Sequence, residues 1–142
     1  MTKPDSFVLD TKPYELQPGE PYMSEAQQAH FKGILSRWKE SLMSKIDATV
    51  TQLKGESAQF SDLNDRASQE EEFSLELQAR HREAKLVARI NGALEAIEHH
   101  DYGYCDECGV EIGIRRLEAR PTAVLCIDCK TLQEIKEKRA NG

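Results

Sequence analysis

Four cysteines near the end of the chain stand in two pairs with the spacing of a metal site. Cys105 and Cys108 form the first C-x-x-C pair, and Cys126 and Cys129 form the second, with residues 109–125 between them. Two thiolates on each of two tight turns can reach one tetrahedral zinc ion. Because four thiolates complete its coordination shell, we expect one structural Zn²⁺ and no open position for a substrate.

The residues around the cysteines fit this interpretation. Gly109 suits the left-handed backbone that closes such a turn. His99 and His100 precede the first pair, but the shell is already full, so we interpret them as solvated residues at a helix end. Thiolates can be oxidised with release of zinc, so the sequence also permits redox sensing as a secondary role.

The segment closed by the metal is too short to form a core unaided, so neighbouring elements must support it. We expect a last helix from about Ile127 to Arg139, with Leu132 and Ile135 facing inward against the zinc finger.

Composition and charge indicate the shape of the molecule and the kinds of partner it can bind. The chain has 142 residues, of which 39% are hydrophobic and 6% aromatic, and this predicts an elongated molecule. A net charge of −6 argues against broad binding to nucleic-acid phosphates, and we expect no sequence-specific DNA binding. No apolar run reaches the roughly 20 residues of a membrane span, and the first residues lack a secretory signal, so we expect no membrane association and a cytoplasmic location.

A long helix is expected to begin after Ser24. Ser24 and Gln27 form a capping-box pattern, in which the hydroxyl accepts an amide of the first turn. The helix can run to about Ala58, on the order of 50 Å. Its apolar stripe consists of Phe31, Ile34, Leu35, Trp38, Leu42, Ile46, Val50 and Leu53.

A second helical pattern of similar length begins near Asn64 to Ala67. Its stripe consists of Phe73, Leu77, Ala84, Val87, Ile90, Leu94 and Ile97. Each helix has one apolar face, so the two are expected to pack as an antiparallel pair with residues 60–66 at the tip. Arg80 and Asn91 fall on or near this seam. The sequence leaves open a dimeric four-helix bundle, although we expect a monomer.

The first 23 residues carry four of the five prolines, at Pro4, Pro13, Pro18 and Pro21. They are either a disordered tail or a segment that packs on the globular part through Phe7 to Leu9 and Tyr14, which we prefer. The predicted fold is mainly α. Its parts are an N-terminal segment (1–23), an antiparallel coiled coil (24–99) and a Cys₄ zinc-finger domain with a C-terminal helix (100–142).

The tip sequence "DLNDRASQEEEF" has two interpretations. It is either a solvated loop whose aspartates cap a helix, or the end of a narrow rod that carries Asp62 and Asp65 into a confined place on a partner. The residue types alone do not choose between them.

The stretches "GEPYMSEAQQAHF", "DLNDRASQEEEFSLELQAR" and "YGYCDECGVEIGIRRLEARPTAVLCIDCKTL" resemble the DksA family of bacterial transcription factors. The resemblance covers the chain from about Gly19 onward. It implies a non-enzymatic regulator of the stringent response that inserts its coiled coil into the secondary channel of RNA polymerase and destabilises promoter complexes. Such a regulator represses ribosomal RNA promoters and activates some promoters of amino-acid biosynthesis.

The resemblance also implies roles for particular residues. Asp62, Asp65 and Ala67 match the functional tip. The alarmone ppGpp would bind at the polymerase interface through Leu86, Arg89, Arg120 and Lys130, and Arg82 is a further candidate for contact with polymerase. Cationic side chains suit pyrophosphate because they form charge-assisted hydrogen bonds with its oxygens. Arg89 departs from the lysine common in the family, which keeps the charge but changes the geometry.

The residue types also allow other functions. A zinc-finger DNA binder would use Arg115, Arg116 and Arg120, although Glu111 and Glu118 dilute that patch. An enzyme would use Asp62 and Asp65 as an acid–base or magnesium-binding pair. In a related version, the tip would coordinate the magnesium of polymerase and promote transcript cleavage. An exposed tip has no pocket that excludes water, which argues against acid–base chemistry there.

Overall fold

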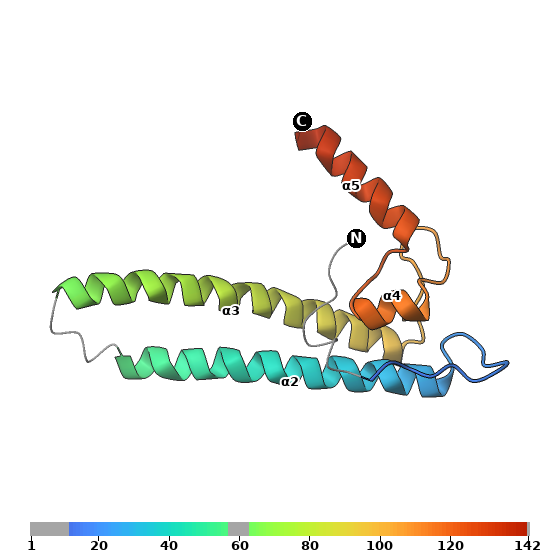
Figure 1. Ribbon diagram of the computed structural model, residues 1–142, viewed down its shortest axis with the longest axis horizontal. Helices are drawn as coiled ribbons and strands as arrows, with labels where there is room; N and C mark the ends of the chain where they lie inside the picture. Colours follow the sequence, from blue (N-terminus) through green and yellow to red (C-terminus); the bar gives the residue numbers. More distant parts are fainter. Residues whose placement is uncertain (1–11, 57–62, 142) are drawn as a thin grey trace. The chain divides into compact units, whose positions relative to one another are not determined.

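The computed structural model describes residues 12–56 and 63–141, which form four helices in the described part of the chain (Figure 1). They are α2 (Glu25–Glu56), α3 (Leu63–Glu98), α4 (Ile114–Ala119) and α5 (Ile127–Asn141). The chain divides into two compact units. The hairpin unit comprises Arg37–Asn91, and the cysteine unit comprises the residues up to Ser36 and from Gly92 onward.

The hairpin unit contains α2 from Arg37 onward and α3 as far as Asn91. These two helical segments run antiparallel beside each other, as the sequence predicts (Figure 1). Trp38, Leu42, Val87 and Ile90 are buried between them. Thr49 of α2 is also buried, and its Oγ1 lies 3.1 Å from a carboxylate oxygen of Glu76 on α3. The seam therefore combines apolar packing with a polar link between the helices.

Burial along the predicted stripes is incomplete. Val50, Leu53 and Leu77 were expected in the seam, but they are 44%, 37% and 43% exposed. Ala84, also predicted for the stripe, is exposed as well. Two helices alone share one narrow line of contact, and a side chain only slightly off that line remains in water.

The two polar residues expected near the seam, Arg80 and Asn91, differ in burial. Arg80 is half-buried, and its Nε lies 3.0 Å from a carboxylate oxygen of Glu83 one turn along α3. Asn91 is exposed, so it does not interrupt the seam.

The amino end of α2 is fixed by hydrogen bonds around the predicted cap. Ser24 Oγ accepts the amide of Gln27 at 3.2 Å, which confirms the cap. The Gln27 side chain accepts the amide of Met23 at 2.7 Å and donates to the Pro21 carbonyl at 3.2 Å. Because Met23 has a left-handed backbone with φ of 52°, these bonds hold a conformation that a non-glycine residue seldom adopts.

The core of the cysteine unit joins both long helices to the segment that follows them. Its buried side chains include Phe31, Ile34, Leu35, Ile97, Tyr102, Ile112 and Leu117. The Phe31 and Tyr102 rings lie 5.7 Å apart, and the Tyr102 hydroxyl donates to the Pro121 carbonyl at 2.7 Å. Aromatic packing therefore attaches the region around the cysteines to α2.

The described part of the N-terminal segment belongs to the same unit and contacts α2 and α4 there. The Tyr14 ring meets His30 of α2 edge-on at 5.2 Å, and its backbone amide donates to Glu118 of α4 at 2.7 Å. The Tyr14 hydroxyl donates to Glu20. Phe7 to Leu9, which were expected to pack with Tyr14, lie outside the described residues.

The last helix forms where the sequence predicts it, but its predicted packing is wrong. Leu132 and Ile135 were expected to face inward, and they are 57% and 43% exposed. No residue of α5 is buried. The spacing of apolar residues identifies one face of a helix, but it does not provide an element to cover that face.

None of the helices in the described part of the chain is both long enough and apolar enough to cross a bilayer.

Candidate functional site

The four cysteine sulfurs come together in one cluster. One sulfur from each of Cys105, Cys108, Cys126 and Cys129 lies within 4.8 Å of the others. The sulfurs of Cys108 and Cys126 are 3.7 Å apart. Tetrahedral zinc with Zn–S bonds of about 2.3 Å needs sulfurs separated by about 3.8 Å. The cluster therefore fits one zinc ion held by all four residues.

The first pair is positioned by a short two-stranded ribbon. The amide of Cys105 donates to the Val110 carbonyl at 2.8 Å, and Tyr104 forms an antiparallel bridge with Glu111. Gly109 has a φ of 78°, and its amide donates to the Cys105 carbonyl at 2.9 Å. The left-handed glycine expected at this turn is confirmed.

The second pair lies at the start of α5. The Cys126 carbonyl accepts the amide of Lys130 at 3.0 Å, as in a first helical turn, and the Cys126 sulfur accepts the amide of Cys129 at 3.4 Å. The amide of Asp106 donates to the Val124 carbonyl at 2.8 Å, which joins the two cysteine segments. Backbone hydrogen bonds thus position both pairs without a large core.

The surroundings of the sulfurs favour binding to a cation. Burial of the Cys105 sulfur opposes ionisation, but backbone amides, led by that of Cys108, outweigh it and lower the pKa of this thiol to about 6. The neighbouring sulfurs, first that of Cys126, raise the pKa of Cys129. Four thiolates at this distance repel one another unless a cation lies among them. The donor set therefore suits a thiolate-binding divalent metal.

His99 and His100 are exposed and do not belong to this cluster. Nε2 of His99 lies 3.8 Å from a carboxylate oxygen of Glu95, one turn earlier on α3. Their interpretation as solvated residues at a helix end is confirmed.

The predicted tip lies at the edge of the described residues. Asp62 is outside them. Asp65 and Ala67 belong to the beginning of α3, and the structure gives no description of their side chains.

The residues predicted for ppGpp and polymerase contact are divided between the two units. In the hairpin unit, Arg82, Leu86 and Arg89 are spaced four and three residues apart on one face of α3; both arginines are exposed and Leu86 is half-buried. In the cysteine unit, Arg120 directly follows α4 and Lys130 lies in the first turn of α5; both are half-buried.

The arginines considered for DNA binding differ in their surroundings. Arg115 is exposed, whereas Arg116 is half-buried and donates through Nε to the Leu125 carbonyl at 3.1 Å. Arg116 therefore supports the backbone next to Cys126. The sequence indicates Arg116 only as part of a basic patch, and its bond to Leu125 could not be predicted because nothing local connects positions 116 and 125.

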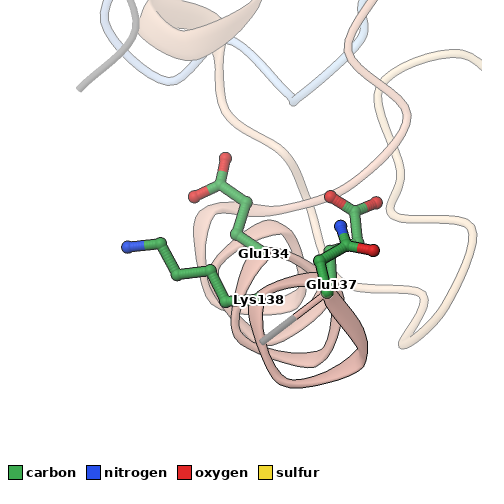
Figure 2. A pocket seen from close by; sticks show the side chains of 4 residues that line it. Glu134, Glu137 and Lys138 are labelled. Carbon is green, nitrogen blue, oxygen red and sulfur yellow. The ribbon is translucent and has the colours of Figure 1, made fainter.

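Two pockets on the described surface lie each on a single helix, and neither suggests a small-molecule site. One is lined by Glu134, Glu137, Lys138 and Asn141, all of α5 (Figure 2). Another is lined by Ser74, Leu77, Gln78, His81 and Arg82, all of α3. A pocket lined by a single helix cannot surround a ligand as binding cavities do.

Together, the two-helix hairpin and the four-cysteine cluster define a helical zinc-finger protein. The family described as "DnaK suppressor protein DksA, N-terminal domain" matches residues 27–97, and the "Prokaryotic dksA/traR C4-type zinc finger" matches residues 100–134. The chain therefore belongs to the DksA family, and its four cysteines form the family's zinc finger. The resemblance predicted from the sequence motifs is confirmed.

Individual relatives support this assignment. The RNA polymerase-binding transcription factor DksA of Escherichia coli K12 is 58% identical over 135 residues, which cover 95% of this chain and 89% of that protein. The protein of the same name from Haemophilus influenzae is 54% identical over 145 residues and covers both chains fully. The structure of transcription factor DksA2 from Pseudomonas aeruginosa is similar, with a TM-score of 0.77, 43% identity, and coverage of 86% of this chain and 94% of that chain.

Proposed function

We propose that this protein is a transcription regulator that binds RNA polymerase. The observation that carries the proposal is the 58% identity to an RNA polymerase-binding transcription factor over 95% of the chain, which includes both long helices and the zinc finger. The protein would act in the cytoplasm, as a monomer, without reading a DNA sequence itself.

The narrow hairpin suits insertion into the secondary channel of polymerase. Two packed helices present a small cross-section, and the acidic tip motif with Asp62, Asp65 and Ala67 follows the first of them. In this proposal the two carboxylates interact with charged elements near the catalytic centre, and the small side chain of Ala67 permits close approach. The result is destabilisation of promoter complexes, with repression of ribosomal RNA promoters and activation of some amino-acid biosynthesis promoters.

We assign the response to ppGpp to the cationic residues at the polymerase interface. Arg82 and Arg89 project from the α3 face that also carries Leu86, and both are exposed. Arg120 and Lys130 would supply further contacts from the cysteine unit. Guanidinium groups suit a pyrophosphate because they can donate two hydrogen bonds to its oxygens at once.

The zinc finger has a structural role in this function. The four thiolates occupy every position of a tetrahedral ion, so the metal stabilises the fold around the cysteines and leaves no site for catalysis. The hydrogen bond from Arg116 to the Leu125 carbonyl supports a structural zinc finger over a DNA-binding one, because this guanidinium already binds the protein's own backbone.

The test is transcription in vitro from a ribosomal promoter, with and without ppGpp, using purified polymerase. Asp65→Asn removes one tip charge and keeps the side-chain size, so the variant should bind polymerase like the parent but lose most of its repression. Glu71→Gln is the matched control, since Glu71 is an exposed carboxylate farther along α3. Repression by Asp65→Asn equal to that of the parent would contradict the assigned role of the tip.

A further inference from the structure

The first cysteine pair lies on a ribbon with an open end. We call residues 103–113 the cysteine ribbon. Backbone bonds of 2.8 Å cross it from Cys105 to Val110 and from Ile112 to Gly103, and the tight turn lies between the crossing segments. The end away from the turn is formed by Gly103 and Gly113.

The hydroxyl of Tyr22 closes this open end. It donates to the Gly103 carbonyl at 2.6 Å and accepts the amide of Gly113 at 3.0 Å. One hydroxyl therefore connects the two sides of the ribbon, continuing the series of backbone bonds that begins near the turn. The ring of Tyr22 also meets Tyr104 on the ribbon edge-on, with centroids 5.6 Å apart.

The backbone around Tyr22 is itself firmly held. The Gln27 side chain binds the Met23 amide and the Pro21 carbonyl, on either side of Tyr22. Met23 packs so closely on Gly103 that a β-carbon there would lie 2.9 Å from Met23 Cγ. The backbone that carries the Tyr22 side chain is thus held by the start of α2 as well as by packing against the ribbon.

We propose that Tyr22 is a positioning residue for the zinc site and sets how fast the metal leaves. Zinc bound by four thiolates leaves by losing ligands one after another, and opening of the ribbon moves Cys105 and Cys108 away from the second pair. A hydroxyl that joins Gly103 to Gly113 opposes this opening. The segment before α2 therefore controls zinc retention from outside the coordination shell.

The experiment measures zinc transfer from the full-length, zinc-loaded protein to excess 4-(2-pyridylazo)resorcinol, followed by absorbance. Tyr22→Phe removes the hydroxyl and both of its hydrogen bonds, so zinc should leave at least about three- to tenfold faster, the factor expected for the loss of one hydrogen bond. Tyr14→Phe is the matched control. This variant also removes one tyrosine hydroxyl from the segment before α2, but that hydroxyl donates to Glu20 and not to the ribbon. The rate of zinc release from Tyr14→Phe should therefore stay close to that of the parent.

An increase of less than twofold for Tyr22→Phe, or equal acceleration by both variants, would overturn the proposal. A second measurement needs no variant: amide hydrogen exchange of the zinc-bound parent. Among residues 12–56 and 63–141, the Tyr22 hydroxyl is the one acceptor that the Gly113 amide binds, so exchange of this amide should be slowed as strongly as that of Ile112, whose amide binds the Gly103 carbonyl. Rapid exchange at Gly113 would also refute the role of Tyr22.

Discussion

Nε of Arg116 on α4 lies 3.1 Å from the carbonyl oxygen of Leu125, the residue directly before Cys126. A guanidinium thus fixes the backbone from which the second cysteine pair begins. The half-buried position of Arg116 strengthens this bond, because water competes less for either partner.

We predict that Arg116→Ala weakens the zinc-bound cysteine unit. Loss of a hydrogen bond from a charged group costs about 1.5–3 kcal/mol. The measurement is the guanidinium chloride concentration at which zinc is released. Arg115→Ala is the control, since Arg115 is exposed, and it should leave this midpoint nearly unchanged. Equal shifts for the two variants would show that overall charge, and not the bond to Leu125, causes the effect.

The close approach at Gly103 leads to a second prediction. Gly103 has a φ of 95°, and a β-carbon there would lie 2.9 Å from Met23 Cγ and 3.0 Å from the Tyr22 hydroxyl oxygen. Gly103→Ala should therefore lower the free energy of unfolding by about 1–3 kcal/mol, from backbone strain together with overpacking.

Gly92→Ala is the matched control for this glycine. Gly92 lies within α3, and a β-carbon there would meet nothing within 4 Å. Alanine favours a helix interior over glycine by about 0.5–1 kcal/mol, so Gly92→Ala should stabilise the protein. Thermal unfolding followed by circular dichroism compares the two variants, and destabilisation by both would contradict the assignment of the effect to the contact with Met23.

Glu20 provides a pH-dependent prediction. Hydrogen bonds from Tyr14 and then Ser24 lower the pKa of this carboxyl to about 2 from an ordinary value of 4.5. A carboxyl with a lower pKa in the folded state stabilises that state above the unfolded pKa and loses this contribution as pH falls through the folded one. The contribution of Glu20 is therefore full above about pH 5 and disappears between 4.5 and 2.

The measurement compares the stability of the parent and Glu20→Gln across this pH range. The parent should be more stable at neutral pH, and the difference should shrink as the solution is acidified. A difference that stays constant down to pH 2 would show that the charge of Glu20 contributes nothing to stability.

The sequence predicts best those structural features that depend on residues close together along the chain. The spacing of Cys105 and Cys108 identifies half of a zinc site, and Ser24 with Gln27 identifies the beginning of α2, because these signals lie within one turn. The roles of Tyr22 and Arg116 could not be predicted, since their partners at Gly103, Gly113 and Leu125 are neighbours only in the fold. Likewise, apolar spacing in α5 marks a face but cannot tell whether anything covers it.

The last prediction concerns side-chain burial, which decreases from Ile90 back toward the beginning of α3. Ile90 is fully buried in the hairpin unit, whereas Leu77, on the same predicted stripe, is 43% exposed. Truncation of a buried isoleucine removes its transfer free energy and leaves a cavity, so Ile90→Ala should cost about 2–5 kcal/mol. Leu77→Ala should cost less than about 1 kcal/mol, because much of that side chain already contacts water. Urea unfolding followed by circular dichroism measures both, and equal costs would show that the seam is packed uniformly along α3.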